Sequence, residues 1–136
     1  MSDIAMSIQD AVTAALRNDA PLRDMFKTNA VRLYDVPPTN APSPYLTVGE
    51  DSINELEGEG LDLSEVEATV HVWSLTDPPG KVEAKRLGGR VKDVLLALAD
   101  GPMIRTTWRV AERYFIDADG VTCHGVITIG MAYEPA

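Results

Sequence analysis

Cysteine and histidine are scarce in this sequence, which limits the metal and redox chemistry that it can support. The chain of 136 residues has one cysteine, Cys123, and two histidines, His71 and His124. One thiol excludes a disulfide within the chain and a zinc site built on cysteines. Cys123 and His124 are neighbours on a predicted strand, so their side chains point to opposite faces. We therefore expect no metal and no other cofactor.

The sequence also lacks the motifs that mark common catalytic sites. It contains neither a Gly-x-Ser-x-Gly elbow nor a glycine-rich loop of the kind that holds phosphates. The segment 117–120, Asp-Ala-Asp-Gly, begins like a calcium-binding loop, but no glutamate follows at the twelfth position. We interpret it as a hairpin turn and predict that the protein is not an enzyme. The competing hypothesis is an enzyme that uses Cys123 or His71.

Long apolar runs and basic N-terminal residues are missing as well. No stretch of about eighteen apolar residues is present, which predicts that nothing in the chain spans a membrane. Residues 1–10 contain two aspartates and no basic residue, which argues against a secretory signal. The length and the 45% hydrophobic content are typical of one soluble domain. We expect a single domain over residues 1–136 that is assembled in the bacterial cytoplasm.

Basic residues are absent from one acidic stretch in the middle of the chain. The formal net charge is −9, and eight acids with no base lie between Glu50 and Glu67. The rest of the chain is nearly neutral, with thirteen acids against twelve bases. Because phosphate would be repelled, the stretch opposes nucleic-acid binding. We predict a long acidic loop over residues 53–64, either solvated or functional, whose leucines are able to dock on a neighbour.

Hydrophobic periodicity predicts helices first, then strands, then one long helix and a closing hairpin. Apolar residues recur at helical spacing in residues 7–16 and 81–98, and a short helix is expected between Asp19 and Phe26. Period-two alternation predicts strands over residues 31–34, 45–52, 65–73, 103–116 and 121–133. This order favours an α+β fold with an antiparallel sheet of about four strands and helices packed on one face.

Two features of the predicted helix and sheet concern surfaces on which other parts of the protein or a neighbouring subunit can pack. Gly88 and Gly89 weaken the middle of the long helix, and we expect the pair to admit the close approach of another backbone. On the sheet face opposite the helices we expect Trp73, Arg105 and Arg109. Aromatic residues and arginine are enriched at interface centres, so these three side chains are candidate subunit contacts.

Several short segments occur in an order that is typical of one family. They are an N-terminal helix leading to Val31-Arg32-Leu33-Tyr34, then Val36-Pro37-Pro38, the strand Pro44-Tyr45-Leu46-Thr47-Val48-Gly49, the strand Val70-His71-Val72-Trp73-Ser74, a helix with Lys85, Val91 and Leu95, and a hairpin ending at Tyr133-Glu134. In this combination the chain resembles the tail completion, or tail terminator, family of long-tailed phages and gene transfer agents. The resemblance covers nearly the whole chain.

The resemblance implies a structural virion protein of small α+β type. Members of the family are expected to form a hexameric ring that caps the tail tube, ends tail polymerisation and joins the tail to the head connector. The implied partners are further copies of the chain, the major tail tube protein and the head-side stopper or connector protein. DNA is expected to pass through the lumen without specific binding. The implied location is the head–tail junction of the virion.

Within such a ring the acidic loop is an expected point of contact. Glu55, Glu57, Glu59 and Leu61 are candidates for the subunit interface or for the lining of the lumen. In the lumen, like charge would keep the genome from adhering. The alternative function that the residues allow is a cytoplasmic small α+β module that binds a ligand or a protein without catalysis.

Overall fold

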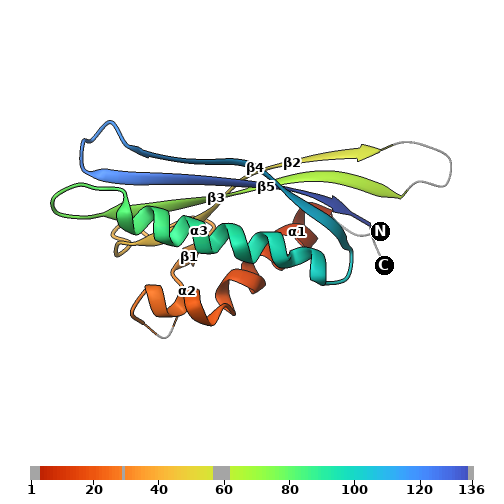
Figure 1. Ribbon diagram of the computed structural model, residues 1–136, viewed down its shortest axis with the longest axis horizontal. Coiled ribbons are helices and arrows are strands. Elements are labelled where there is room, and N and C mark those ends of the chain that lie inside the picture. Colours follow the sequence, from red (N-terminus) through yellow and green to blue (C-terminus); the bar gives the residue numbers. More distant parts are fainter. Residues whose placement is uncertain (1–3, 29, 57–61, 135–136) are drawn as a thin grey trace.

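The computed structural model describes residues 4–28, 30–56 and 62–134. Over these ranges the chain forms, in order, α1 (Ile4–Arg17), α2 (Ala20–Met25), β1 (Leu33–Tyr34), β2 (Tyr45–Leu56), β3 (Leu63–Leu75), α3 (Val82–Leu96), the short 3-10 helix η1 (Ala97–Asp100), β4 (Ile104–Ile116) and β5 (Thr122–Tyr133). Figure 1 shows the helices on one face of a long, twisted sheet. The predicted α+β fold, with helices packed on one face, is confirmed.

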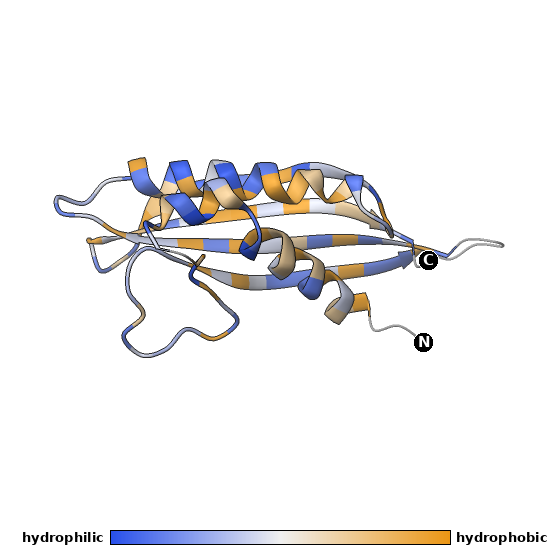
Figure 2. Cartoon of the chain, turned by 90° about the horizontal axis from the view of Figure 1, so that it is seen from below, coloured by the Kyte–Doolittle hydropathy of each residue, from blue (hydrophilic) through white to orange (hydrophobic). Residues whose placement is uncertain are grey.

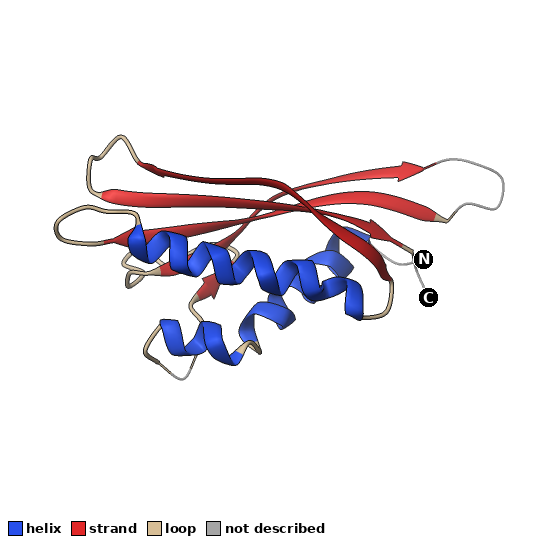
Figure 3. Cartoon of the chain, in the orientation of Figure 1, coloured by secondary structure: helices blue, strands red, loops and turns tan. Residues whose placement is uncertain are grey.

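The strands of the described residues form one five-stranded sheet in the order β1-β2-β3-β5-β4. Strand β1 pairs parallel with β2, and every other neighbouring pair is antiparallel. Figure 3 shows this sheet as one layer and the helices as a second. The central position of β3 agrees with its sequence, because alternate residues from Val66 to Val72 are buried beneath the helices.

The core lies between this sheet and two amphipathic helices. The buried residues of α3 are Ala84, Leu87, Gly88, Val91, Val94 and Leu95, and those of α1 are Ile8, Val12 and Leu16. They recur at the three- and four-residue steps that place side chains on one stripe of a helix. Figure 2 shows the same alternation of apolar and polar residues along the helices and strands. The helical layer is therefore held to the sheet mainly by burial of apolar surface.

A carboxylate at the start of α2 ties that short helix to α3. Asp19 caps α2 by accepting a hydrogen bond from the backbone N–H of Leu22 at 3.0 Å, as its place in the sequence predicts. Its two oxygens also accept from Arg90 Nε at 2.8 Å and Nη2 at 2.7 Å. The hydrogen bond from Arg90 is the main cause that holds the pKa of Asp19 below its usual value. The pair fixes α2 against the middle of α3.

The predicted acidic loop over residues 53–64 is wrong at both ends, because the two strands that flank it are longer than expected. Strand β2 continues to Leu56 and β3 begins at Leu63, while residues 57–61 lie outside the described residues. After a register shift between Val48 and Asp51, β2 pairs with β3 as far as its last residue. This part of β2 is exposed and has no apolar face, so its sequence shows no period-two signal.

The predicted faces of β4 are also wrong between its two bulges, from Thr106 to Arg109, because the strand is irregular. Its register with β5 shifts after Ile104 and again after Arg109. Opposite residues of antiparallel strands share a face. Arg109 lies opposite buried Ile129 and is therefore on the helix side, whereas Trp108 lies opposite Gly130 on the other side. Each extra residue at a bulge reverses the faces of the residues that follow.

Strand β4 lies close to α3 because Gly88 has no side chain. A Cβ atom at Gly88 would overlap the hydroxyl of Tyr114 and lie 2.8 Å from its Cζ, whereas a Cβ atom at Gly89 would meet nothing within 4 Å. The glycine pair thus admits an aromatic ring at one position, not the backbone that the sequence suggested. The hydroxyl of Tyr114 donates to Glu112 Oε2 at 2.7 Å, and burial raises the pKa of Tyr114.

We expect the two glycines to respond in opposite directions to the same substitution. Gly89→Ala should raise the free energy of unfolding by up to about 1 kcal/mol, because alanine is the better helix former. Gly88→Ala should lower it by about 1–3 kcal/mol, the usual cost of forcing a methyl group into occupied space. Chemical denaturation of the two variants measures both effects. Equal stabilisation by both would show that Tyr114 does not need the space.

Candidate assembly surfaces

Trp73 lies on the sheet face away from the helices, as predicted, and we call this face the open face. Its Nε1 donates a hydrogen bond to Thr47 Oγ1 at 3.0 Å. Its ring stacks on Tyr45, with centroids 6.2 Å apart, and on His124, with centroids 3.9 Å apart. Trp73 is therefore half-buried in a row of rings that crosses β2, β3 and β5. The row presents aromatic rings on the open face, and aromatic residues are enriched in contact surfaces.

The two histidines meet on this open face and join two carboxylates. His71 Nδ1 lies 2.7 Å from His124 Nε2. At the outer ends of the pair, His71 Nε2 lies 3.5 Å from Glu50 Oε1, and His124 Nδ1 lies 3.3 Å from Asp117 Oδ1. We call these four residues the histidine relay. Both imidazoles are partly buried, while Glu50 is exposed.

The spacing of the relay limits how many protons it holds. Each carboxylate needs an N–H on the nitrogen that faces it, and the contact between the rings needs one proton more. A proton on both nitrogens of the 2.7 Å contact would set two N–H groups against each other. The geometry therefore allows one proton at this contact.

Burial and the neighbouring charges shift the pKa of His124. Burial lowers the pKa of His124; the Asp117 carboxylate opposes this, and His71 and Arg113 add to it. The unfolded chain then binds a proton at this position more readily than the folded chain does. Folding stability is consequently present above the usual histidine pKa of 6.5 and is lost as the pH falls below it.

We expect the free energy of unfolding to decrease between about pH 7 and pH 5.5, where carboxylates with ordinary or lowered pKa values remain mostly ionised. His124→Asn keeps a polar side chain on the open face but removes the titration, so it should flatten this pH dependence. Denaturation curves across the interval measure the slope for both proteins. A slope that is unchanged in the variant would exclude His124 as its source.

Arg105 and Arg109 are both exposed on the edge strand β4, and Arg109 does not lie on the open face with Trp73. Arg105 forms an ion pair with Glu134 of the same chain. Arg109 projects on the helix side of the sheet, where it helps to keep the pKa of Glu112 low. The prediction that Arg109 lies on the open face is wrong, because the bulges of β4 reverse its faces. The role of Arg105 and Arg109 as subunit contacts remains a prediction.

Glu55, the one acidic candidate that the structure describes, lies at one end of the molecule. Glu55 is exposed near the end of β2, and Glu57, Glu59 and Leu61 lie outside the described residues. Figures 1 and 2 show that β2 and β3 extend beyond the helical layer at this end. Asp51 begins the regular part of the hairpin, and burial raises its pKa even though a backbone hydrogen bond from Thr69 opposes the shift.

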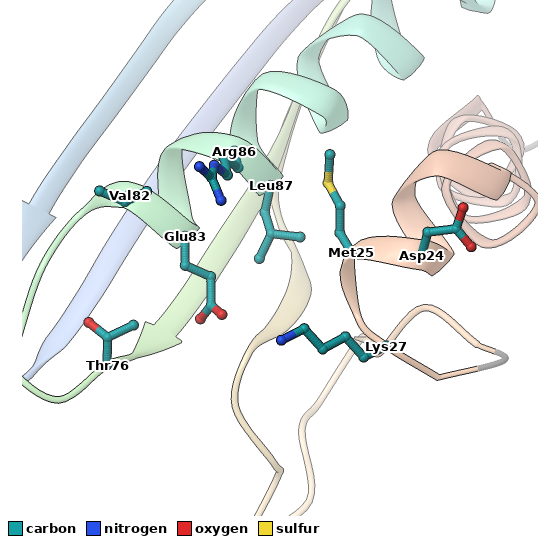
Figure 4. Close-up of a pocket in the computed structure, with 8 residues that line it drawn as sticks. All are labelled: Asp24, Met25, Lys27, Thr76, Val82, Glu83, Arg86 and Leu87. Carbon is teal, nitrogen blue, oxygen red and sulfur yellow. The ribbon is translucent and has the colours of Figure 1, made fainter.

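A cavity of about 430 Å³ opens between α2 and the start of α3. It is lined by Asp24, Met25, Lys27, Thr76, Val82, Glu83, Arg86 and Leu87. Figure 4 shows side chains from both helices extending into the space between them. Two acids and two bases line it, so their charges balance and favour a ligand of neither sign.

Metal and thiol chemistry find little support in these surfaces. In the part of the chain that the structure describes, no group of three or more His, Cys, Asp or Glu side chains is placed to hold a metal ion. Cys123 is buried, and burial raises the pKa of its thiol, which disfavours the reactive thiolate. Within the same described ranges, no helix combines the length and the apolar character needed to cross a bilayer.

The sequence places His71 and His124 on separate predicted strands and does not predict that they meet. The structure brings them together because Trp73 of β3 pairs with His124 of β5, which sets His71 diagonally across from His124. Aligning the predicted strands 65–73 and 121–133 in antiparallel register is the signal that would have found the pair. That register depends on contacts between distant segments, and the turn residues do not determine it.

Comparison with known proteins identifies the family. The sequence profile of the family described as Tail completion protein gp17 matches residues 10–134. The chain belongs to this tail completion family. A curated relative, tail completion protein gp17 of Bacillus phage SPP1, is 25% identical over 126 residues, which cover 90% of this chain and 89% of the relative. The family predicted from the sequence is thereby confirmed, together with a structural role in the tail of a virion.

Two solved structures are similar to this member of the tail completion family. The bacteriophage SPP1 gp17 protein superposes with a TM-score of 0.58 at 26% identity, covering 95% of this chain and 91% of that chain. A chain from the virion of a native gene transfer agent particle superposes with a TM-score of 0.83 at 20% identity, covering 99% and 100%. At that identity the second likeness establishes the fold.

Proposed function

We propose that this protein ends the growth of a virion tail by forming a closed ring on the last layer of the tail tube. The observation that carries the proposal is the match to the tail completion family over residues 10–134, nearly the whole chain. On this view the ring joins the finished tail to the head-side connector, and the chain acts through surfaces alone. The number of copies that the family resemblance suggests is six.

Ring formation requires that each copy carry two different surfaces that fit each other. A contact between unlike patches relates each copy to the next by a fixed rotation. The copies close into a ring when a whole number of these rotations makes one full turn. The elongated sheet supplies unlike patches, because its two edge strands differ in charge and its two ends differ in shape (Figure 1). Glu55, Arg105 and Arg109 lie on the edge strands and Trp73 lies on the open face, and we propose all four as subunit contacts.

The remaining surfaces of such a ring face the tail tube, the connector and the lumen. The major tail tube protein is the proposed partner on one side and the head-side stopper or connector protein on the other. DNA passes through the lumen without specific binding. The net charge of −9 supports this, because a negative lining repels the phosphate backbone and keeps the genome moving.

The proposal is tested in a particle-producing strain that lacks this gene. We expect overlong or ragged tails beside heads without tails, because nothing then caps the tube or bridges it to the connector. Electron microscopy gives the tail-length distribution and the fraction of heads that carry a tail. The same strain with the gene restored on a plasmid is the control. Tails of normal length attached to heads in the deletion strain would contradict the proposal.

A further inference from the structure

At each edge of the sheet, the outer side of a strand has no neighbouring strand among the described residues along most of its length. Strand β1 pairs only with Leu46 and Thr47 of β2, so β2 is unpaired on its outer side from residue 49 to residue 56. Strand β4 pairs with β5 on its inner side and is the last strand at the other edge. Unpaired N–H and C=O groups along such edges are templates for another strand.

The two edges carry opposite charge. The unpaired part of β2 holds Glu50, Asp51 and Glu55 with no base. Strand β4 holds Arg105, Arg109 and Arg113 with one acid, Glu112. That acid has a partner in the same chain, because Lys92 Nζ lies 3.1 Å from its Oε1, and Arg105 is likewise paired with Glu134. The positive charge that the β4 edge offers to a neighbour therefore comes from Arg109 and Arg113.

Both edges also expose apolar side chains. Ile53 on β2 is 37% exposed, and on β4 Trp108 is 37% and Val110 is 41% exposed. Each strand includes a six-residue stretch of regular pairing, 51–56 in β2 and 111–116 in β4. Apolar side chains beside a regular, unpaired backbone favour the addition of a strand over simple solvation.

The charges determine which edges can meet. Two β2 edges would bring acids together, and two β4 edges would bring arginines together, so both like pairings are opposed. Only the pairing of β2 with β4 joins opposite charges. That pairing is a contact between unlike surfaces, which is the kind that generates a ring.

We propose that the outer edge of β2 in one copy pairs with the outer edge of β4 in the next copy, so that the sheets continue from subunit to subunit. The inference rests on the proposed ring and names the interface that closes it. It assigns Glu55 to the subunit contact, not to the lumen. It also gives a reason for the length of the β2–β3 hairpin, which extends beyond the helices and offers a bare edge (Figure 1).

Charge reversal on one edge, and then on both edges, tests the pairing. The β2 variant is Glu50→Lys with Glu55→Lys, and the β4 variant is Arg109→Glu with Arg113→Glu. Each is expressed in the deletion strain, and joined particles are counted by electron microscopy. We expect each variant to reduce joined particles by roughly tenfold or more, because like charges across an interface oppose association. The protein that carries both reversals should restore joining, since its edges are again opposite in sign.

Three controls keep the result specific. Lys81→Glu with Lys85→Glu changes the charge by the same amount as the β4 variant, at exposed positions at the start of α3 and not on an edge strand, and it should leave joining intact. His71→Asn removes the contact with Glu50 and leaves the charges of both edges unchanged, and it should also join normally. Circular dichroism and thermal unfolding of the purified variants exclude misfolding as the cause of any loss.

The outcomes separate this inference from the proposed function. Normal joining by both single-edge variants, or no recovery when both edges are reversed, would overturn the β2–β4 pairing while the deletion phenotype still supports the tail role. A deletion strain with normal joined particles would overturn the tail role itself. Loss of joining in the Lys81 and Lys85 variant alone would place the interface on α3 instead, against the proposal.

Discussion

Burial of one face of the sheet by α1 and α3 determines which surfaces of this chain stay uncovered. The stripe from Ala84 to Leu95 packs on the central strands, and Gly88 lets the same helix meet Tyr114 on the edge strand β4. Because the helices cover one face and are shorter than the hairpin of β2 and β3, the opposite face, both edges and the hairpin end remain available. Those uncovered parts are the surfaces that a ring-forming protein needs.

Most of the fold was predictable because its signals are local. The period-two run through Val70 and Val72 and the helical spacing of Leu87, Val91 and Leu95 each report which face of one element is buried. Asp19 showed where α2 begins, because a capping side chain acts on residues only three positions away. The family resemblance added what periodicity cannot supply, namely the role in a virion tail.

The features that were not predicted depend on pairing between distant segments. The bulges of β4 turn Arg109 to the helix side, and the sequence carries no local mark of them. The distal part of β2 is a strand without an apolar face, so its charges suggested a loop. The relay of His71 and His124 exists only in the register that β3 and β5 adopt. In each case tertiary contacts, not local propensity, decide where the side chain lies.

We propose that copies of this chain form a ring between the head and the tail, and electron cryomicroscopy of intact particles shows whether they do. We expect the map at the head–tail junction to contain a closed ring of density at the head end of the tail tube, into which the helix-covered sheet fits as one repeating unit. Density at that position that this fold does not fit, or the same fold found elsewhere in the particle, would show that the chain does not form this ring.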